Sequence, residues 1–255
     1  MYKKMLIKKG AIMKKIILLG LISSLTLAQT IKLACDNELK YPLQKVAKQF
    51  KIKTGVDVEI VADNEDNLFK KIQNKNNAKF DLFLPSTFSL ISTHPNLFTA
   101  QKLIGYNKPV IVVRQGNPKK IKTLDDFERS DVIVVLAKPA TSSIGKTTES
   151  ILTKYKDAAF AKKIYQKAIQ VPTTNEITKN IKKKIADASI NWKTTVFQGD
   201  NDKYLSIVNI PYIAPKQQLV LVELKQAPHP KLADKFLDFI AKPKNRMILK
   251  KLGLK

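Results

Sequence analysis

Short apolar segments alternate with amphipathic segments along most of the chain. Apolar, often β-branched runs typical of buried strands occur at 30–34, 56–61, 80–84, 109–113, 132–136, 188–192 and 218–224. Between them, apolar residues recur at three- and four-residue spacing. This spacing predicts helices within 39–50, 68–72, 147–155, 158–169, 174–186, 232–240 and 247–252. The alternation predicts an α/β fold whose parallel-rich sheets are flanked by helices.

Two irregular segments interrupt this alternation. They are IGYNKP at 104–109 and IVNIPYIAPK at 207–216, and the second contains two prolines. A chain that crosses twice between structured regions is expected to form two lobes joined by a double hinge. We assign residues 29–106 plus 217–255 to one lobe and residues 107–216 to the other.

The N-terminal segment has the features of an export signal. Residues 1–28 contain lysines but no acidic residue, and the apolar run IILLGLISSLTL ends at Leu27. Thr26 and Ala28 are small residues suited to cleavage before Gln29. The apolar run is too short to span a bilayer comfortably, although an uncleaved membrane anchor stays open as the alternative. We therefore predict a signal peptide at 1–28 and a periplasmic protein.

The charge of the chain does not favour nucleic-acid binding. The formal net charge is +25, yet only three of the 46 basic residues are arginine. Nucleic-acid readers favour arginine for bidentate phosphate and base contacts, whereas the lysines here are spread along the whole sequence. The positive charge leaves association with an acidic cell-envelope surface open.

Catalytic motifs are missing from the sequence. The single Cys35 lies in a predicted buried strand, and the two histidines are not placed to assist a nucleophile. Neither G-x-S-x-G nor H-E-x-x-H occurs. We therefore expect a binding protein without enzymatic activity, cofactor or metal site.

Four segments, in order, carry a family resemblance. They are IKLACDNELKYPLQKVAKQFKIKTGVDVEI, FDLFLPST, ADASINWKT and KLADKFLDFIAKPKNRMILKKLGL. The chain resembles periplasmic substrate-binding proteins of the molybdate type. The segment GNPKKIKTLDDF is similar to the related accessory-colonization-factor group, which includes a major cell-surface antigen. The resemblance implies a two-lobed, type II periplasmic-binding-protein-like fold. It also implies a monomer that closes on a small anion, such as molybdate or tungstate, and delivers it to an ABC permease in the inner membrane.

The positions that align with the family's oxyanion-binding serines carry acidic residues here. One is Glu38, and the other falls in the stretch that contains Asn64 and Glu65. A carboxylate at a helix start pairs with the N–H groups that an oxyanion would use. Three alternatives follow: the acids only cap helices, they bind a cation or an amine, or an organic phosphate or carboxylate is held mainly by the second lobe.

Further candidates follow predicted strands or begin helices. The segment PATSSIGKTTE follows a strand and opens a helix, which makes Ser142 and Ser143 the strongest anion-binding candidates. It fails the P-loop pattern, because Ala140 stands where that pattern requires glycine. The resemblance places Trp192 where the molybdate type has a ligand-contacting tyrosine. The predicted ligand-binding residues are Glu38, Asn64, Glu65, Ser86, Ser142, Ser143, Thr174, Ile177 and Trp192.

A function of another class stays open from sequence. The same fold can serve as a surface antigen or adhesion factor that works without an importer.

Overall fold

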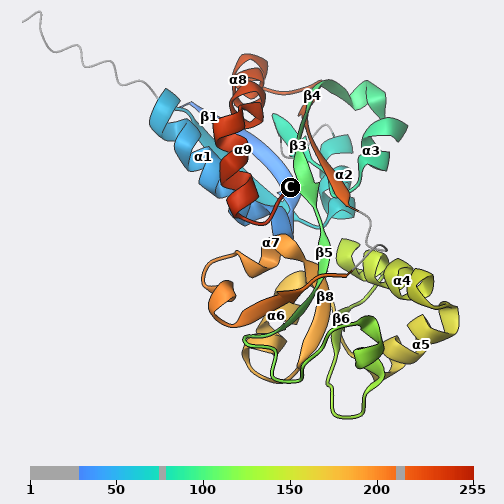
Figure 1. Cartoon of the computed structure of the whole chain (residues 1–255). Helices are drawn as coiled ribbons and strands as arrows, with labels where there is room; N and C mark the ends of the chain where they lie inside the picture. Colours follow the sequence, from blue (N-terminus) through green and yellow to red (C-terminus); the bar gives the residue numbers. More distant parts are fainter. Residues whose placement is uncertain (1–28, 75–78, 211–215) are drawn as a thin grey trace, which may run out of the picture.

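A computed structural model describes residues 29–74, 79–210 and 216–255, so the predicted signal peptide lies outside the described residues. The strands form one five-stranded sheet, one three-stranded sheet and one two-stranded sheet. We call the five-stranded sheet with its helices the first lobe, and the other two sheets with theirs the second lobe (Figure 1). No helix among the described residues is long and apolar enough to cross a membrane.

The first lobe is built from the first and last segments of the described part of the chain. Its strand order is β2-β1-β3-β10-β4, in which β1 lies parallel to β2 and β3, and β10 lies antiparallel to β3 and β4. The strands are β1 (Thr30–Asp36), β2 (Asp57–Asp63), β3 (Leu82–Leu84), β4 (Phe98–Asn107) and β10 (Gln217–Leu224). The helices are η1 (Asn37–Leu39), α1 (Lys40–Thr54), α2 (Glu65–Gln73), α3 (Phe88–Thr93), η2 (Pro95–Leu97), α8 (Pro230–Ala241) and α9 (Pro243–Lys251).

Strand alternation gives this sheet two buried faces. Leu33 and Cys35 of β1 belong to a core formed with α1, α8 and α9, whereas Ala34 belongs to a second core with α2 and α3. In the first core, the Phe50 ring packs edge-on against Phe236, with ring centroids 5.1 Å apart. Figure 1 shows the blue α1 beside the red α8 and α9. Helices from the beginning and the end of the described chain therefore pack in the same core.

The second lobe contains only residues from the middle of the chain. In its three-stranded sheet, β5 lies antiparallel to β8 and β9, while β6 and β7 form a parallel pair. A parallel bridge between Val134 and Ala188 links the two sheets. The strands are β5 (Pro109–Arg114), β6 (Val135–Ala137), β7 (Ile169–Val171), β8 (Ala188–Trp192) and β9 (Leu205–Val208). The helices are η3 (Leu124–Glu128), α4 (Ser143–Tyr155), α5 (Ala158–Lys167), α6 (Thr174–Lys182), α7 (Lys193–Val196) and η4 (Asn201–Lys203).

The predicted α/β class is confirmed, and both lobes mix strand directions. Each predicted strand corresponds to an observed one, but β4, β7 and β9 were not predicted. The segment 104–109, predicted as a break, contains the end of β4 and the start of β5. β4 was missed because it is an edge strand whose only strand partner is β10, and its exposed polar residues Thr99, Gln101 and Lys102 interrupt any apolar run.

The chain passes from the first lobe to the second through Lys108 alone, between β4 and β5. It returns between β9 and β10, in a segment that includes residues outside the described part. The first crossing is held by α7, because Lys193 N donates to Lys108 O at 2.8 Å and Asn107 Nδ2 donates to Thr194 Oγ1 at 3.1 Å. Figure 1 shows the green strand of this crossing running from one lobe into the other.

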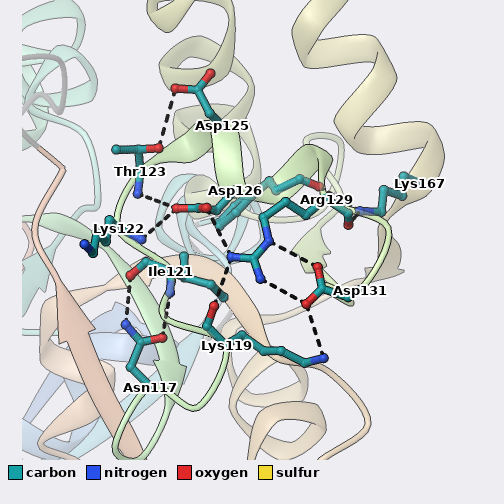
Figure 2. A network of polar contacts seen from close by, with 11 residues as sticks. Asn117, Lys119, Ile121, Lys122, Thr123, Asp125, Asp126, Arg129, Asp131 and Lys167 are labelled. Atoms are coloured by element: carbon teal, nitrogen blue, oxygen red, sulfur yellow. Dashed lines mark hydrogen bonds and ion pairs between the residues drawn. The ribbon is translucent and has the colours of Figure 1, made fainter.

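The motif GNPKKIKTLDDF has a structural role in the second lobe (Figure 2). The Asn117 side chain closes a turn by pairing with both backbone groups of Ile121. Thr123 and Asp126 form a capping box at η3. Arg129 then joins Asp126 to Asp131, and Lys167 Nζ donates to the Arg129 carbonyl. The residues of this network do not line the cleft described below.

Candidate ligand-binding cleft

A cleft of about 810 Å³ is lined by residues of both lobes. This volume falls in the range of sites for small organic molecules. The first lobe contributes the segments after β1, β2 and β3, together with the start of β10. The second lobe contributes the starts of α4 and α6 and the end of β8. The lining therefore combines the carboxyl ends of strands with helix N-termini, which is where open α/β folds bind ligands.

Most acidic groups on the first-lobe wall already have partners inside the protein. Glu65 accepts hydrogen bonds from Ser86 Oγ, Thr87 N and Thr87 Oγ1, each at 2.8 Å. Asp63 Oδ2 lies 2.9 Å from Lys71 Nζ, and its Oδ1 accepts from the Asn64 backbone. Glu65 thus occupies the hydroxyl and amide donors at the end of β3 that could otherwise bind an oxyanion.

Asn64 acts as a helix cap. Its side chain accepts a hydrogen bond from Asn67 N at 2.8 Å, at the N-terminus of α2. This bond satisfies one of the free amide groups of the first turn. Asn64 lines the cleft, but its acceptor is committed to the helix.

Glu38 differs from Asp63 and Glu65. It lines the cleft at η1 yet is only 1% exposed, and its Oε1 has no hydrogen-bond partner. Burial and the neighbouring Asp36 carboxylate raise the pKa of Glu38 well above its usual value. Both effects favour the protonated form of Glu38, which repels an anionic ligand less than an ionised acid would.

The start of α4 forms the opposite wall. Ser142 is the N-cap residue, and its side chain makes no capping hydrogen bond. Lys146 and Thr147 line the cleft one turn further along. The amide groups of the first turn carry a partial positive charge, and Lys146 adds a full one. This wall can hold a phosphate or carboxylate group.

Two close contacts fix the position of α4. A Cβ at Gly145 would lie 2.4 Å from the Lys138 carbonyl oxygen, so only glycine allows this approach. Across the cleft, Ser143 Oγ donates to Asp36 Oδ2 at 3.4 Å and joins the two lobes. The glycine of the GKT segment therefore serves packing between the helix and the preceding loop.

The start of α6 and the end of β8 complete the second-lobe wall. Thr173 caps α6 through its hydroxyl, which accepts from Glu176 N, and Thr174 lines the cleft beside it. Trp192 is 2% exposed and lines the cleft, and its indole Nε1 has no hydrogen-bond partner. Trp192 is therefore both a core residue and a boundary of the cleft.

The structure places eight of the nine predicted site residues on this cleft, and Ile177 elsewhere. Ile177 is fully buried in the second-lobe core and does not line the cleft. It lies on the apolar face of α6, which packs inward, whereas the cleft meets only the first residues of that helix. The eight are Glu38, Asn64, Glu65, Ser86, Ser142, Ser143, Thr174 and Trp192.

Sequence reasoning missed Gln217. This residue begins β10 and lines the cleft, with its Nε2 donating to Ser86 O at 2.5 Å and its Oε1 unpaired. It lies 131 positions from Ser86 in sequence. No local pattern marks it, because only the return of the chain into the first lobe brings it there.

The acidic residues that the structure describes are not grouped as metal ligands are. Among the described residues, no group of three or more His, Cys, Asp or Glu side chains is arranged to hold a metal ion. Cys35 is buried in β1, where burial, Asp36 and Glu38 raise the pKa of its thiol. The cleft therefore presents hydrogen-bonding groups and one positively charged wall.

Comparison with known proteins identifies the family. A family model described as bacterial extracellular solute-binding protein matches residues 31–255. The chain belongs to this family. No curated protein matches the sequence.

Solved structures of other solute-binding proteins share the fold. The Azotobacter vinelandii periplasmic molybdate-binding protein is 14% identical, with a TM-score of 0.74 over 88% of this chain and 98% of that one. PEB3 with bound L-phospholactate is 20% identical, with a TM-score of 0.70 over 88% and 99%. The Mycobacterium tuberculosis sulfate-binding protein SubI is 16% identical, with a TM-score of 0.74 over 89% and 86%. At these identities the likeness establishes the fold and leaves the ligand open.

Proposed function

We propose that this protein is the exported binding component of an ABC importer and that it traps a small anionic ligand between its lobes. The observation that carries the proposal is the start of α4, which presents unpaired amide groups, Ser142 and Lys146 to a cleft lined by both lobes. A ligand that touches both lobes favours their closed arrangement. We assign residues 29–106 plus 217–255 to one moving unit and residues 107–216 to the other.

Within this class, an organic phosphate or carboxylate fits better than a bare oxyanion such as molybdate or tungstate. Glu65 already accepts hydrogen bonds from the donors of Ser86 and Thr87, so the first-lobe wall has few free donors for an oxyanion. The cleft volume of about 810 Å³ suits a larger ligand. The phospholactate held by PEB3, which shares the fold, is an organic phosphate of this kind.

Replacing Ser142 with Asp tests the anion site. Aspartate is a favoured N-cap residue, so Ser142→Asp should leave the free energy of unfolding unchanged or slightly higher. The new carboxylate should compete for the α4 amide groups and lower the affinity for anions at least tenfold. Titration calorimetry with molybdate, tungstate, sulfate, phosphate, glycerol 3-phosphate and citrate measures this effect.

Ser150→Asp is the matched control, because Ser150 lies on the same helix but does not line the cleft. Equal anion affinities in Ser142→Asp and the unmodified protein would overturn the assignment of the α4 site.

Delivery to a permease and residence in the periplasm complete the proposal. The family of extracellular solute-binding proteins supports both. Deletion of the protein should abolish uptake of the anion that it binds. A protein that binds none of the anions tested would instead favour a surface antigen or adhesion role.

A further inference from the structure

Five buried side-chain atoms have no hydrogen-bond partner among the described residues, and three belong to the cleft lining. These three are Glu38 Oε1, Trp192 Nε1 and Gln217 Oε1. Buried polar groups are nearly always paired, and an unpaired one destabilises the fold by about 1–3 kcal/mol. Unpaired groups gathered in one cleft therefore indicate that a ligand supplies their partners.

The chemistry of these atoms describes the missing partner. Trp192 Nε1 can only donate a hydrogen bond, whereas Gln217 Oε1 can only accept one. Glu38 lies beside Asp36, which favours its protonated form. A carboxyl that donates to Asp36 through its other oxygen keeps Oε1 as an acceptor. A fully ionised oxyanion could satisfy the tryptophan but would leave both acceptors unpaired. A hydroxyl group can donate to Glu38 or Gln217 while it accepts from Trp192.

These side chains are separate from the wall that suits the anion. Glu38 and Gln217 belong to the first lobe and Trp192 ends β8, whereas Ser142 and Lys146 belong to the start of α4. One cleft thus offers a subsite for an anionic group and a second set of two acceptors and one donor. A carbon chain with an anionic group and one or more hydroxyls can occupy both.

Lobe movement provides access to the unpaired atoms. Gln198, which follows α7 of the second lobe, donates through Nε2 to Glu38 O at 2.8 Å. Glu38 therefore lies at the interface between the lobes. Trp192 directly precedes α7, the helix beside this interface. When a two-lobed protein opens, groups at the interface become exposed, and they are buried again when it closes on a ligand.

We infer that Glu38, Trp192 and Gln217 select a hydroxylated organic anion over inorganic oxyanions and over the same anion without hydroxyls. This inference rests on the proposed function and specifies its ligand class. Glu38 and Trp192 are specificity-determining residues, and α4 supplies most of the anion binding.

Two matched pairs of probes test the inference in titration calorimetry: glycerol 3-phosphate against propyl phosphate, and glycerate against propionate. The hydroxylated member of at least one pair should bind about tenfold or more tightly than its partner, as expected for one or two added hydrogen bonds. It should also bind more tightly than molybdate or inorganic phosphate. Trp192→Phe and Glu38→Met should abolish the preference, whereas Glu38→Gln, which keeps an acceptor, should retain most of it.

Thr148→Val is the matched control, because Thr148 Oγ1 is also buried and unpaired but does not line the cleft. This variant should leave the preference unchanged. Equal binding of both members of each pair, or tighter binding of molybdate, would overturn the inference while the anion-binding function stands. If no anion binds at all, the proposed function falls, and this inference falls with it.

Discussion

At the scale of single residues, Glu65 takes up hydrogen-bond donors on the first-lobe wall. Its carboxylate accepts three hydrogen bonds from Ser86 and Thr87, the donors at the end of β3. The residue therefore acts as an internal anion at a position where the molybdate type is expected to receive an external one. An acidic residue in this place changes both the charge of the wall and its hydrogen-bonding capacity.

Glu65→Ala should raise the affinity for molybdate about tenfold, because it frees these donors and removes a negative charge. The same change should lower the free energy of unfolding by about 1–2 kcal/mol through the lost hydrogen bonds. Titration calorimetry and urea unfolding measure the two effects. Asp66→Ala is the control, since Asp66 lines the cleft as an exposed acid. If this control raises the affinity equally, charge alone accounts for the change.

Gly145→Ala should destabilise the protein by about 1–3 kcal/mol, the usual range for overpacking. The added methyl group would meet the backbone of Lys138 at 2.4 Å, and backbone cannot rotate away as a side chain can. Thermal unfolding measures the loss. Thr153→Ala, at an exposed position of the same helix, should leave the melting temperature nearly unchanged. If Gly145→Ala is as stable as the unmodified protein, the backbone at 138–139 can shift to make room for the methyl group at little cost in free energy.

At the scale of elements, β10 carries a buried carboxyl group beside α8. Glu223 is 5% exposed, and burial together with Asp234 raises its pKa to about 7 from the usual 4.5. The unfolded chain ionises at this position near pH 4.5, whereas the folded protein keeps the proton up to about pH 7. Glu223 therefore favours folding at low pH, and this contribution is lost as the pH rises from about 4.5 to about 7.

The free energy of unfolding of Glu223→Gln, relative to the unmodified protein, should consequently rise by on the order of 1 kcal/mol between pH 5 and pH 8. Urea unfolding at several pH values measures this difference. Asp234→Asn should flatten the pH dependence as well, because it removes the neighbouring carboxylate. A constant difference between Glu223→Gln and the parent across this range would contradict the assignment.

At the scale of the whole molecule, the last residues of the chain connect the two lobes. Lys255 pairs with Tyr106 through both backbone groups, which extends the first-lobe sheet at the crossing. Leu254 is buried in the first-lobe core. A Cβ at Gly253 would lie 2.8 Å from the ring of Phe197, which follows α7 in the second lobe. Figure 1 marks the C-terminus near the junction of the lobes.

Removal of residues 253–255 should lower the melting temperature by several degrees, because it exposes core surface around Leu254 and frees the edge at Tyr106. It should also increase the radius of gyration in small-angle X-ray scattering, as the lobes lose a contact beside the hinge. Lys251→Ala, at an exposed position just before the tail, serves as the control. An unchanged radius of gyration would restrict the tail to a stabilising role within the first lobe.

Sequence alone determined the α/β class, the order of most elements and the position of the candidate residues at strand ends and helix starts. These features depend on periodicity and capping, which act over a few neighbouring residues. Tertiary structure decided what those residues do. Ile177 turns into the core, Glu65 pairs with Ser86 and Thr87, and Gln217 reaches the cleft from the far end of the chain. Pairing and burial depend on contacts between distant segments, so no local pattern can reveal which polar groups are paired and which are unpaired.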